Sequence, residues 1–313
     1  MPSRSLGTEA SGIARQLWGD SAEASAGATF PGVRVLFCGV RGSTPAPGAD
    51  FVRYGGNTCC VALSHNGHDP SLVLDAGTGL QRLAKHLAGR PFRGTILLGH
   101  LHWDHTHGIP FFPAGDHPDG AVTVLLPAQG DAEAVLERAM SPPHFPITPS
   151  QLRGSWRFDG LDEGQHRLEG FTVLARDIPH KGGRTFGYRV SDDTGRSLAY
   201  LSDHAPALVS AGPDGFGDYH DAAVALAENV DVLIHDAQYT PEEFPARRTW
   251  GHSTIDYAVG LAEAAGARSL VLFHHDPSRT DDQLDAVVAG LVDAAIPVCA
   301  ASEGSVLDLS RRG

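Results

Sequence analysis

The segment that follows Gly99 carries four side chains suited to metal binding within six residues: His100, His102, Asp104 and His105. It comes directly after the apolar run 95–98, which predicts a strand. On extended backbone, residues two apart face the same way, so His100 and His102 can bind one ion. Asp104 and His105 follow on a turning segment and can serve a second ion. Imidazole and carboxylate ligands suit Zn²⁺, and also Mn²⁺ or Fe²⁺, so the segment predicts a centre of two divalent ions.

Further ligands are expected where other predicted strands end. His180 follows the run 171–175, Asp203 follows the run 197–201, and a histidine pair follows the run 269–273. A strand delivers the side chain at its end to one rim of its sheet, so these residues can converge on the first cluster. His204 and His275 compete for the last of these places. We prefer His274 because it directly ends its strand.

The order of these residues, HxHxDH followed by His, Asp and His, resembles the metallo-β-lactamase superfamily. This resemblance implies an α/β fold: a four-layer αββα sandwich with two mixed sheets and a dinuclear site. It implies that one ion is held by His100, His102 and His180, and the other by Asp104, His105 and His274, with Asp203 bridging both. A hydroxide bridging two divalent ions is a nucleophile at neutral pH, because each ion lowers the pKa of the bound water.

Two more motifs resemble the phosphodiesterase branch of that superfamily, which contains ribonuclease Z and cyclic-phosphodiester hydrolases. They are Asp236, after the run 230–234, and the Gly251–Thr254 segment, GHST. The resemblance implies that Asp236 orients His252, which contacts the scissile phosphate or protonates the leaving alkoxide. The implied catalytic residues are therefore Asp104, Asp236 and His252. Asp236 stands where this branch more often has Glu, which shortens the reach by one methylene.

The glycine-rich segments 39–45, 54–58 and 75–79 resemble the opening of the same branch. Ser43 in the first of them is a candidate for phosphate contact, although such turns are usually only turns. Asp75 is expected to orient a ligand histidine, because metal-bound imidazoles usually need an acceptor for their other nitrogen.

Charge bears on the size of the substrate. The net charge is -13, whereas nucleic-acid binders normally present a basic patch, and no glycine-rich or basic arm is evident between His105 and His180. We therefore expect a small phosphodiester such as a 3′,5′-cyclic nucleotide and no large nucleic acid. The alternatives are a tRNA 3′-processing endonuclease of the ribonuclease Z type, a hydrolase of a non-phosphate ester, lactam or thioester, and a non-catalytic nucleotide sensor.

Aromatic residues in the predicted loops could stack on a substrate ring, with ordinary loop packing as the alternative. The candidates for substrate contact, beside Ser43, are Phe111, Phe112, His144, Phe145 and Tyr239.

The elements that must position these residues can be predicted from apolar periodicity. The predicted strands are 33–38, 59–64, 71–75, 95–98, 122–126, 171–175, 187–190, 197–201, 230–234, 269–273 and 305–309. The predicted helices are 78–87, 132–140, 219–228, 254–265 and 281–291, with Ser253 and Thr280 as caps of the last two.

Strands dominate the first third without a helix between each pair, which argues against a doubly wound nucleotide-binding fold. They return late in the chain, which indicates two sheets between helices. We expect a mobile tail over residues 1–30 and one hydrolase domain over residues 31–313.

The four cysteines are Cys38, Cys59, Cys60 and Cys299, and they form no CxxC pair. Neighbouring strand residues face opposite ways, so Cys59 and Cys60 should not share a metal, and all four are interpreted as buried apolar residues in a reducing cytosol. There is no apolar run of about 18 residues and no secretory signal. We expect a cytoplasmic protein without membrane contact, and a homodimer because relatives commonly pair.

Overall fold

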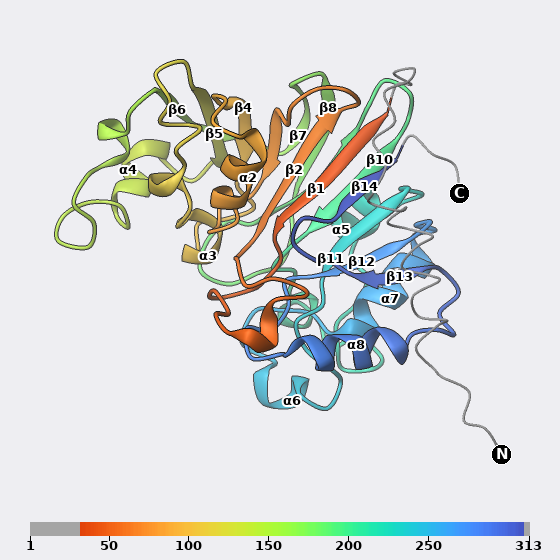
Figure 1. Cartoon of the computed structure of the whole chain (residues 1–313). Helices are drawn as coiled ribbons and strands as arrows, with labels where there is room; N and C mark the ends of the chain where they lie inside the picture. The colour runs from red at the N-terminus through yellow and green to blue at the C-terminus, as the bar shows by residue number, and fades with distance from the viewer. Residues whose placement is uncertain (1–31, 310–313) are drawn as a thin grey trace.

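Two seven-stranded mixed sheets form the centre of the computed structural model, which describes residues 32–309 (Figure 1). The first sheet has the order β14-β1-β2-β3-β4-β5-β6 and the second the order β13-β12-β11-β10-β9-β8-β7. The strands of the first are β1 (Val33–Gly39), β2 (Cys60–His65), β3 (Leu72–Leu74), β4 (Arg93–Leu97), β5 (Ala121–Pro127), β6 (Ser155–Leu161) and β14 (Val306–Asp308). Those of the second are β7 (Gly164–Leu168), β8 (Phe171–Asp177), β9 (Phe186–Ser191), β10 (Ser197–Leu201), β11 (Val232–Asp236), β12 (Leu270–Phe273) and β13 (Val298–Ala300).

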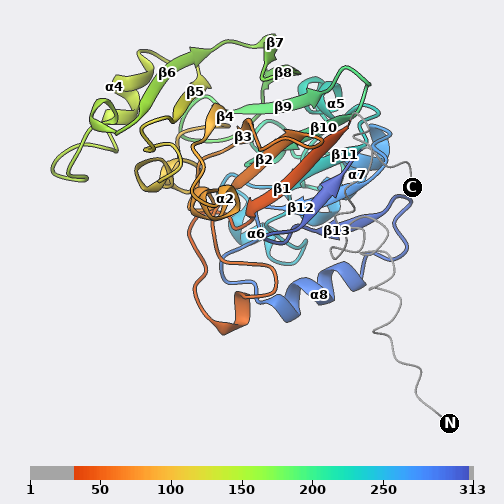
Figure 2. The ribbon, with the colours of Figure 1, turned by 45° about the horizontal axis from the view of Figure 1, so that its top comes forward.

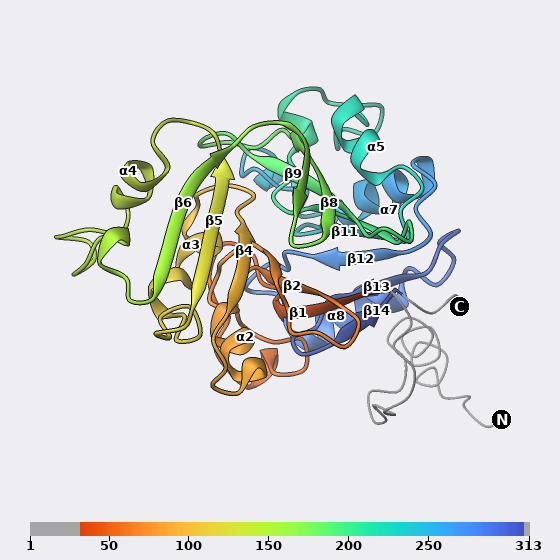
Figure 3. The same cartoon turned by 90° about the horizontal axis from the view of Figure 1, so that it is seen from above.

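Helices cover the outer face of each sheet, which completes the predicted four-layer sandwich (Figures 2 and 3). The first half of the chain contains α2 (Leu80–Leu87), α3 (Trp103–Thr106) and α4 (Ala132–Glu137). The second half contains α5 (Asp221–Ala227), α6 (Phe244–Arg247), α7 (Ile255–Ala264) and α8 (Asp281–Ala289). The 3₁₀ turns are η1 (Ala49–Phe51), η2 (Ile109–Phe111), η3 (Pro149–Gln151) and η4 (Pro206–Leu208).

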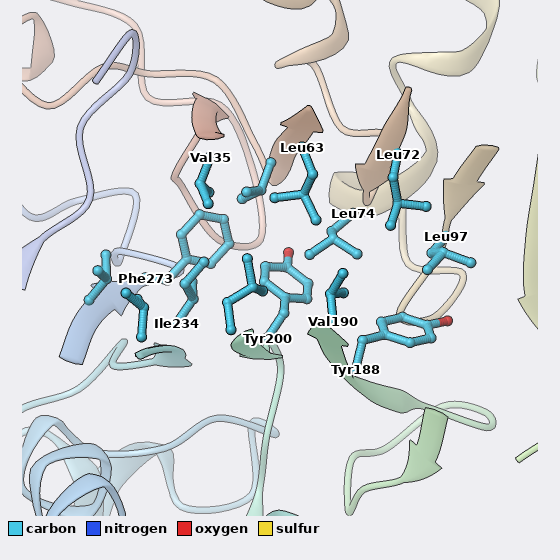
Figure 4. Packing of buried hydrophobic residues seen from close by; sticks show 14 of the residues in the cluster. Val35, Leu63, Leu72, Leu74, Leu97, Tyr188, Val190, Tyr200, Ile234 and Phe273 are labelled. Atoms are coloured by element: carbon cyan, nitrogen blue, oxygen red, sulfur yellow. The ribbon is translucent and has the colours of Figure 1, made fainter. Parts of the chain in front are cut away.

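The apolar side chains between the two sheets alternate with those that face the helices, as a strand requires. Figure 4 shows the inner layer, in which side chains from both sheets interdigitate: Val35, Leu63, Leu72, Leu74 and Leu97 from the first, and Tyr188, Val190, Tyr200, Ile234 and Phe273 from the second. The outer layers contain the apolar face of α2 on one side and those of α5 and α7 on the other. This packing fixes the two sheets against each other, and with them the strand ends that carry the site.

Several predicted details differ from the structure. The cap of α7 is Thr254, whose hydroxyl accepts from the backbone N–H of Tyr257, because Ser253 instead donates to the carbonyl of His204. Strands β6, β7 and β13 were not predicted from the sequence. β6 does alternate, with Trp156 and Phe158 packed against the apolar layer under the helices. β7 has no apolar alternation, and β13 has only three residues.

The expected tail over residues 1–30 lies outside the described residues. Within residues 32–309 the longest helix, α7, has ten residues, and none of the helices there could span a bilayer.

Candidate metal centre

The seven predicted ligands converge at one rim of the sandwich, each delivered by the end of an element. His100 and His102 follow β4, and His102 precedes α3, whose first turn carries Asp104 and His105 inward. His180, Asp203 and His274 follow β8, β10 and β12. All of these strands run toward the same rim, so residues far apart in the sequence become neighbours.

Three histidines form the first ligand group. One ligand atom from each of His100, His102 and His180 lies within 4.8 Å of the others and of an oxygen of Asp203. His180 Nε2 is 3.3 Å from His102 Nδ1. The Nε2 atoms of His100 and His180 are each 3.8 Å from Asp203 Oδ1. The described part of the chain offers neither ring nitrogen of the buried His100 a hydrogen-bond partner, which suits a metal ligand.

The second group gathers around the other oxygen of Asp203. His105 Nε2 and His274 Nε2 are 2.8 Å and 3.0 Å from Asp203 Oδ2. Asp104 Oδ2 is 3.3 Å from His105 Nε2 and 3.2 Å from His274 Nε2. Asp203 therefore turns one oxygen to each group, as a carboxylate bridging two ions must.

The protonation of the two groups also fits divalent cations. Burial lowers the pKa of His100 well below its ordinary value, and it lowers the pKa of His180 to about 4. These imidazoles are neutral at pH 7 and offer free lone pairs. In the second group burial opposes protonation, but Asp75, Asp203 and Asp104 together hold the pKa of His105 well above its ordinary value. Those carboxylates form a negatively charged pocket whose charge a bound cation would balance.

Strained backbone marks the same rim. Four non-glycine residues of the site adopt positive φ: Ser43 at 61°, Asp75 at 61°, Asp203 at 56° and His274 at 58°. Such conformations cost about 1–3 kcal/mol each and persist only where the surroundings hold them. These residues directly follow a strand or lie in a turn, and the positive φ directs their side chains toward the centre.

Asp75 fixes the orientation of His105, as expected of a residue behind the ligands. Its Oδ2 is 2.7 Å from His105 Nδ1, so that Nε2 of this imidazole faces the centre. The carboxylate is itself held by the backbone N–H of Gly99 and the hydroxyl of Tyr200, both at 2.7 Å. A carboxylate in this position also raises the basicity of the ligand.

We expect Asp75→Ala to lower the affinity for the second ion by about 10–100-fold, because His105 would lose its acceptor and its fixed tautomer. The ion of the first group should remain bound. The measurement is metal content after dialysis against a graded series of chelator concentrations. Asp69→Ala, which removes an exposed carboxylate paired with Arg90, is the control, and equal metal retention in both variants would contradict this role.

Gln238 orients His274, as Asp75 orients His105. Its Oε1 accepts a hydrogen bond from His274 Nδ1 at 2.8 Å, and its Nε2 lies 3.4 Å from the hydroxyl of Ser43. The backbone N–H of Ser43 donates to Asp104 Oδ2 at 2.7 Å. Gly42 allows this close approach, since a Cβ there would lie 2.2 Å from His274 Nδ1. Ser43 thus supports the second ligand group.

The two competing histidines point elsewhere. His275 Nε2 lies 2.9 Å from the carbonyl of Ala301, and burial lowers its pKa to about 3. His204 lies behind the site, with its ring nitrogens 2.9 Å and 2.6 Å from those of His235 and His220.

The predicted Asp236–His252 pair is formed beside the centre. His252 Nδ1 donates to Asp236 Oδ2 at 2.8 Å and lies 3.7 Å from Asp203 Oδ1. Asp236 Oδ1 accepts from the backbone N–H groups of Gln238 and Ser253, each at 3.1 Å. The shorter aspartate therefore reaches the histidine, and its own position is fixed by the backbone.

The candidates for substrate contact lie in different surroundings. Phe112 is completely buried against Phe92 and Trp156, and this burial rules out the expected stacking on a substrate ring. Tyr239 is also buried, with its ring 5.8 Å from that of His252. His144 is exposed on the segment between α4 and β6.

Other residues of the rim carried no clear signal in the sequence. Trp103 and Trp250 are 66% and 56% exposed and directly precede Asp104 and Gly251. The indole of Trp103 stacks on His107 at 5.5 Å. Cys59, interpreted from the sequence as a buried apolar residue, has its sulfur beside the second ligand group. The two tryptophans could have been noticed in the sequence because they lie in or next to the HxHxDH and GHST motifs. The position of Cys59 beside the ligands depends on the fold.

Comparisons with known proteins agree with this geometry. A family model described as "Beta-lactamase superfamily domain" matches residues 71–275. Ribonuclease Z of Anoxybacillus flavithermus is 27% identical over 324 aligned residues, covering 90% of this chain and 99% of that protein. An uncharacterized protein of Mycobacterium tuberculosis is 30% identical over 262 residues, covering 81% and 85%. The crystal structure of the metallo-β-lactamase fold protein YhfI from Bacillus subtilis superposes with a TM-score of 0.64 at 18% identity, covering 89% of this chain and 100% of that one.

Proposed function

Because the chain belongs to the metallo-β-lactamase superfamily, in the branch that includes ribonuclease Z, we propose that this metal-dependent hydrolase is a phosphodiesterase. The observation that carries the proposal is the Asp236–His252 pair, which lies beside the bridging carboxylate of Asp203. A thioester releases a thiolate, which can leave without a proton, whereas an alkoxide leaving from phosphorus needs one.

The residues of the site have two proposed roles, to hold the metal ions and to donate a proton to the leaving group. Bound divalent ions would supply a water nucleophile at neutral pH and would neutralise charge on the phosphate. Asp203, Asp104 and the histidines hold those ions. Asp236 holds the Nδ1–H of His252, which leaves Nε2 of this imidazole to give a proton to the leaving oxygen.

The proposed substrate is small, such as a 3′,5′-cyclic nucleotide. The longest connection between two strands of the first sheet is residues 128–154, which link β5 to β6 and contain α4 (Figure 1). It carries three acidic and two basic side chains, Asp131, Glu133, Glu137, Arg138 and Arg153. The connections 178–185 and 192–196 at the ends of β9 are short. Because the connection 128–154 is not basic, it offers little attraction to the phosphate backbone of a folded RNA.

A precursor tRNA is the second candidate, and the comparisons favour it over the cyclic nucleotide. The observation in its favour is the similarity to ribonuclease Z, which spans nearly the whole of both chains. A local phosphate-binding surface could serve an RNA substrate in spite of the negative net charge.

The test is a substrate screen with the purified protein and added Zn²⁺ or Mn²⁺. It compares bis-p-nitrophenyl phosphate, a panel of cyclic nucleotides, a precursor tRNA, a lactam and a thioester. Turnover of the cyclic nucleotides supports the small substrate, and cleavage of the tRNA at low nanomolar enzyme supports the second candidate. Turnover of lactam or thioester without any phosphodiester would refute the phosphodiesterase proposal.

If the substrate is a nucleotide, Trp103→Ala should raise its KM by roughly 5- to 150-fold with little change in kcat, because base–aromatic stacking contributes about 1–3 kcal/mol. Trp103 directly precedes Asp104 in the chain, and its indole is exposed beyond the contact with His107. Steady-state kinetics on a cyclic nucleotide and on a dialkyl phosphate without a ring provide the comparison. Val292→Ala, at an exposed apolar residue beyond α8, is the control, and an equal effect on both substrates would argue against stacking.

A further inference from the structure

The sulfur of Cys59 lies among the ligands of the second ion. Cys59 Sγ and one ligand atom from each of Asp104, His105 and His274 lie within 4.8 Å of one another, and all four residues are buried. The thiol donates to the carbonyl of Arg41 at 3.4 Å and lies 3.8 Å from the hydroxyl of Ser202. It is therefore one member of a set of four donors and is not an isolated cysteine.

The fold explains why this cysteine faces the centre. Cys59 directly precedes β2, and its carbonyl accepts from the backbone N–H of Gly77 at 2.9 Å. Its side chain belongs to the layer between the two sheets, at the end of that layer that meets the site. Cys60 faces the opposite way and packs with Cys38 in the layer under α2.

A second feature points to a ligand at the same place. His105 is completely buried, and its Nε2 lies 2.8 Å from Asp203 and 3.3 Å from Asp104, yet the described residues give this nitrogen no hydrogen bond of good geometry. A buried imidazole nitrogen that lies close to carboxylates and a thiol, without a well-formed hydrogen bond, is placed to bind a cation together with them.

We propose that Cys59 is a thiolate ligand of the ion that Asp104, His105 and His274 hold. When the ion binds, the S–H bond breaks, its proton leaves to solvent, and the sulfur electron pair forms the bond to the metal. Zinc–sulfur bonds are about 2.3 Å long and zinc–nitrogen bonds about 2.1 Å, so a sulfur and a nitrogen on one ion are at most about 4.4 Å apart. The four ligand atoms lie within 4.8 Å of one another, so binding one ion needs only a small side-chain adjustment. Zinc at catalytic sites accepts five ligands, so Asp203 can bind as well.

A sulfur ligand would make the two positions unequal. The first group offers three imidazoles, whereas the second would offer a thiolate, which prefers Zn²⁺ or other soft ions to Mn²⁺ or Mg²⁺. The inference rests on the metal site of the proposed hydrolase but not on the identity of its substrate.

The full-length wild-type protein tests the proposal first. With two equivalents of Zn²⁺ bound, X-ray absorption at the zinc edge should show a sulfur scatterer at about 2.3 Å, equal to one sulfur for every two zinc ions. With Co²⁺ in place of zinc, a thiolate-to-cobalt charge-transfer band should appear in the near ultraviolet. A first shell that contains only nitrogen and oxygen would overturn the proposal, even if the protein hydrolyses phosphodiesters.

Two neighbouring variants assign the sulfur. Cys59→Ser should abolish the cobalt band and lower affinity for one of the two ions by roughly tenfold or more. Cys60→Ser, at an equally buried cysteine on the other face, should keep both the band and the affinity. A band that persists in Cys59→Ser would also overturn the proposal. Absence of any phosphodiester turnover, with the sulfur signal present, would instead count against the proposed function alone.

Discussion

Asp203→Ala should abolish hydrolysis, with a fall in kcat/KM on the order of 10⁴-fold or more. Each oxygen of Asp203 faces one of the two ligand groups. Its Oδ1 is 3.8 Å from His100 and His180, and its Oδ2 is 2.8 Å from His105. The variant would lose a ligand from each position at once, and His105 and His274 would lose the nearer of the two carboxylates that they share, Asp203 and Asp104.

Metal content and activity together measure this effect. We expect fewer than two ions for each Asp203→Ala chain after dialysis, with circular dichroism like that of the wild type. Asp203→Asn keeps the shape but removes the charge, and should bind metal more weakly than the wild type. Asp276→Asn, at a buried carboxylate that accepts from Ser278 within its own loop, is the matched control. Two tightly bound ions together with wild-type turnover in Asp203→Ala would contradict a bridging role.

The ligands were predictable because they obey local rules. The spacing of His100 and His102 is that of one face of extended backbone, and His180, Asp203 and His274 each follow an apolar run that is long enough to be recognised as a strand. The order of those runs indicated two sheets between helices, and the family resemblance implied that both sheets are mixed. The division of ligands between two ions came from the family resemblance, since spacing alone does not say which residues meet across the fold.

Residues whose position depends on tertiary contacts were harder to predict. Phe112 lies in a loop with no periodicity, so nothing local marks it as core, and its burial follows from Phe92 and Trp156 packing around it. The alternation of Cys59 and Cys60 was predicted, and the structure places them in different layers. Which of the two faces the metal centre depends on the loop after β3, where the N–H of Gly77 donates to the carbonyl of Cys59 and that of Ala76 donates to the carbonyl of His105, and these contacts are not local.

Loss of the predicted proton donor should distinguish between substrates. His252 lies within 4.8 Å of ligand atoms of Asp203 and His274, but its Nδ1–H is donated to Asp236 Oδ2, so we expect His252→Ala to retain two ions. Turnover of phosphodiesters with alkyl leaving groups should fall by about 10²–10⁴-fold, the usual contribution of a positioned general acid. Bis-p-nitrophenyl phosphate should be affected much less, because p-nitrophenolate is stable enough to leave without a proton.

Asp236 offers an independent test of the same chemistry. If it acts only by orienting His252, then Asp236→Asn should cost less than His252→Ala, and the double variant should be no slower than His252→Ala alone. His166→Ala, at a histidine on the exposed strand β7, is the control for removal of an imidazole. An equal loss on alkyl and p-nitrophenyl esters, or strictly additive losses in the double variant, would rule out proton donation. His252 would then act on the phosphate itself, by binding its charge in the ground state and the transition state alike.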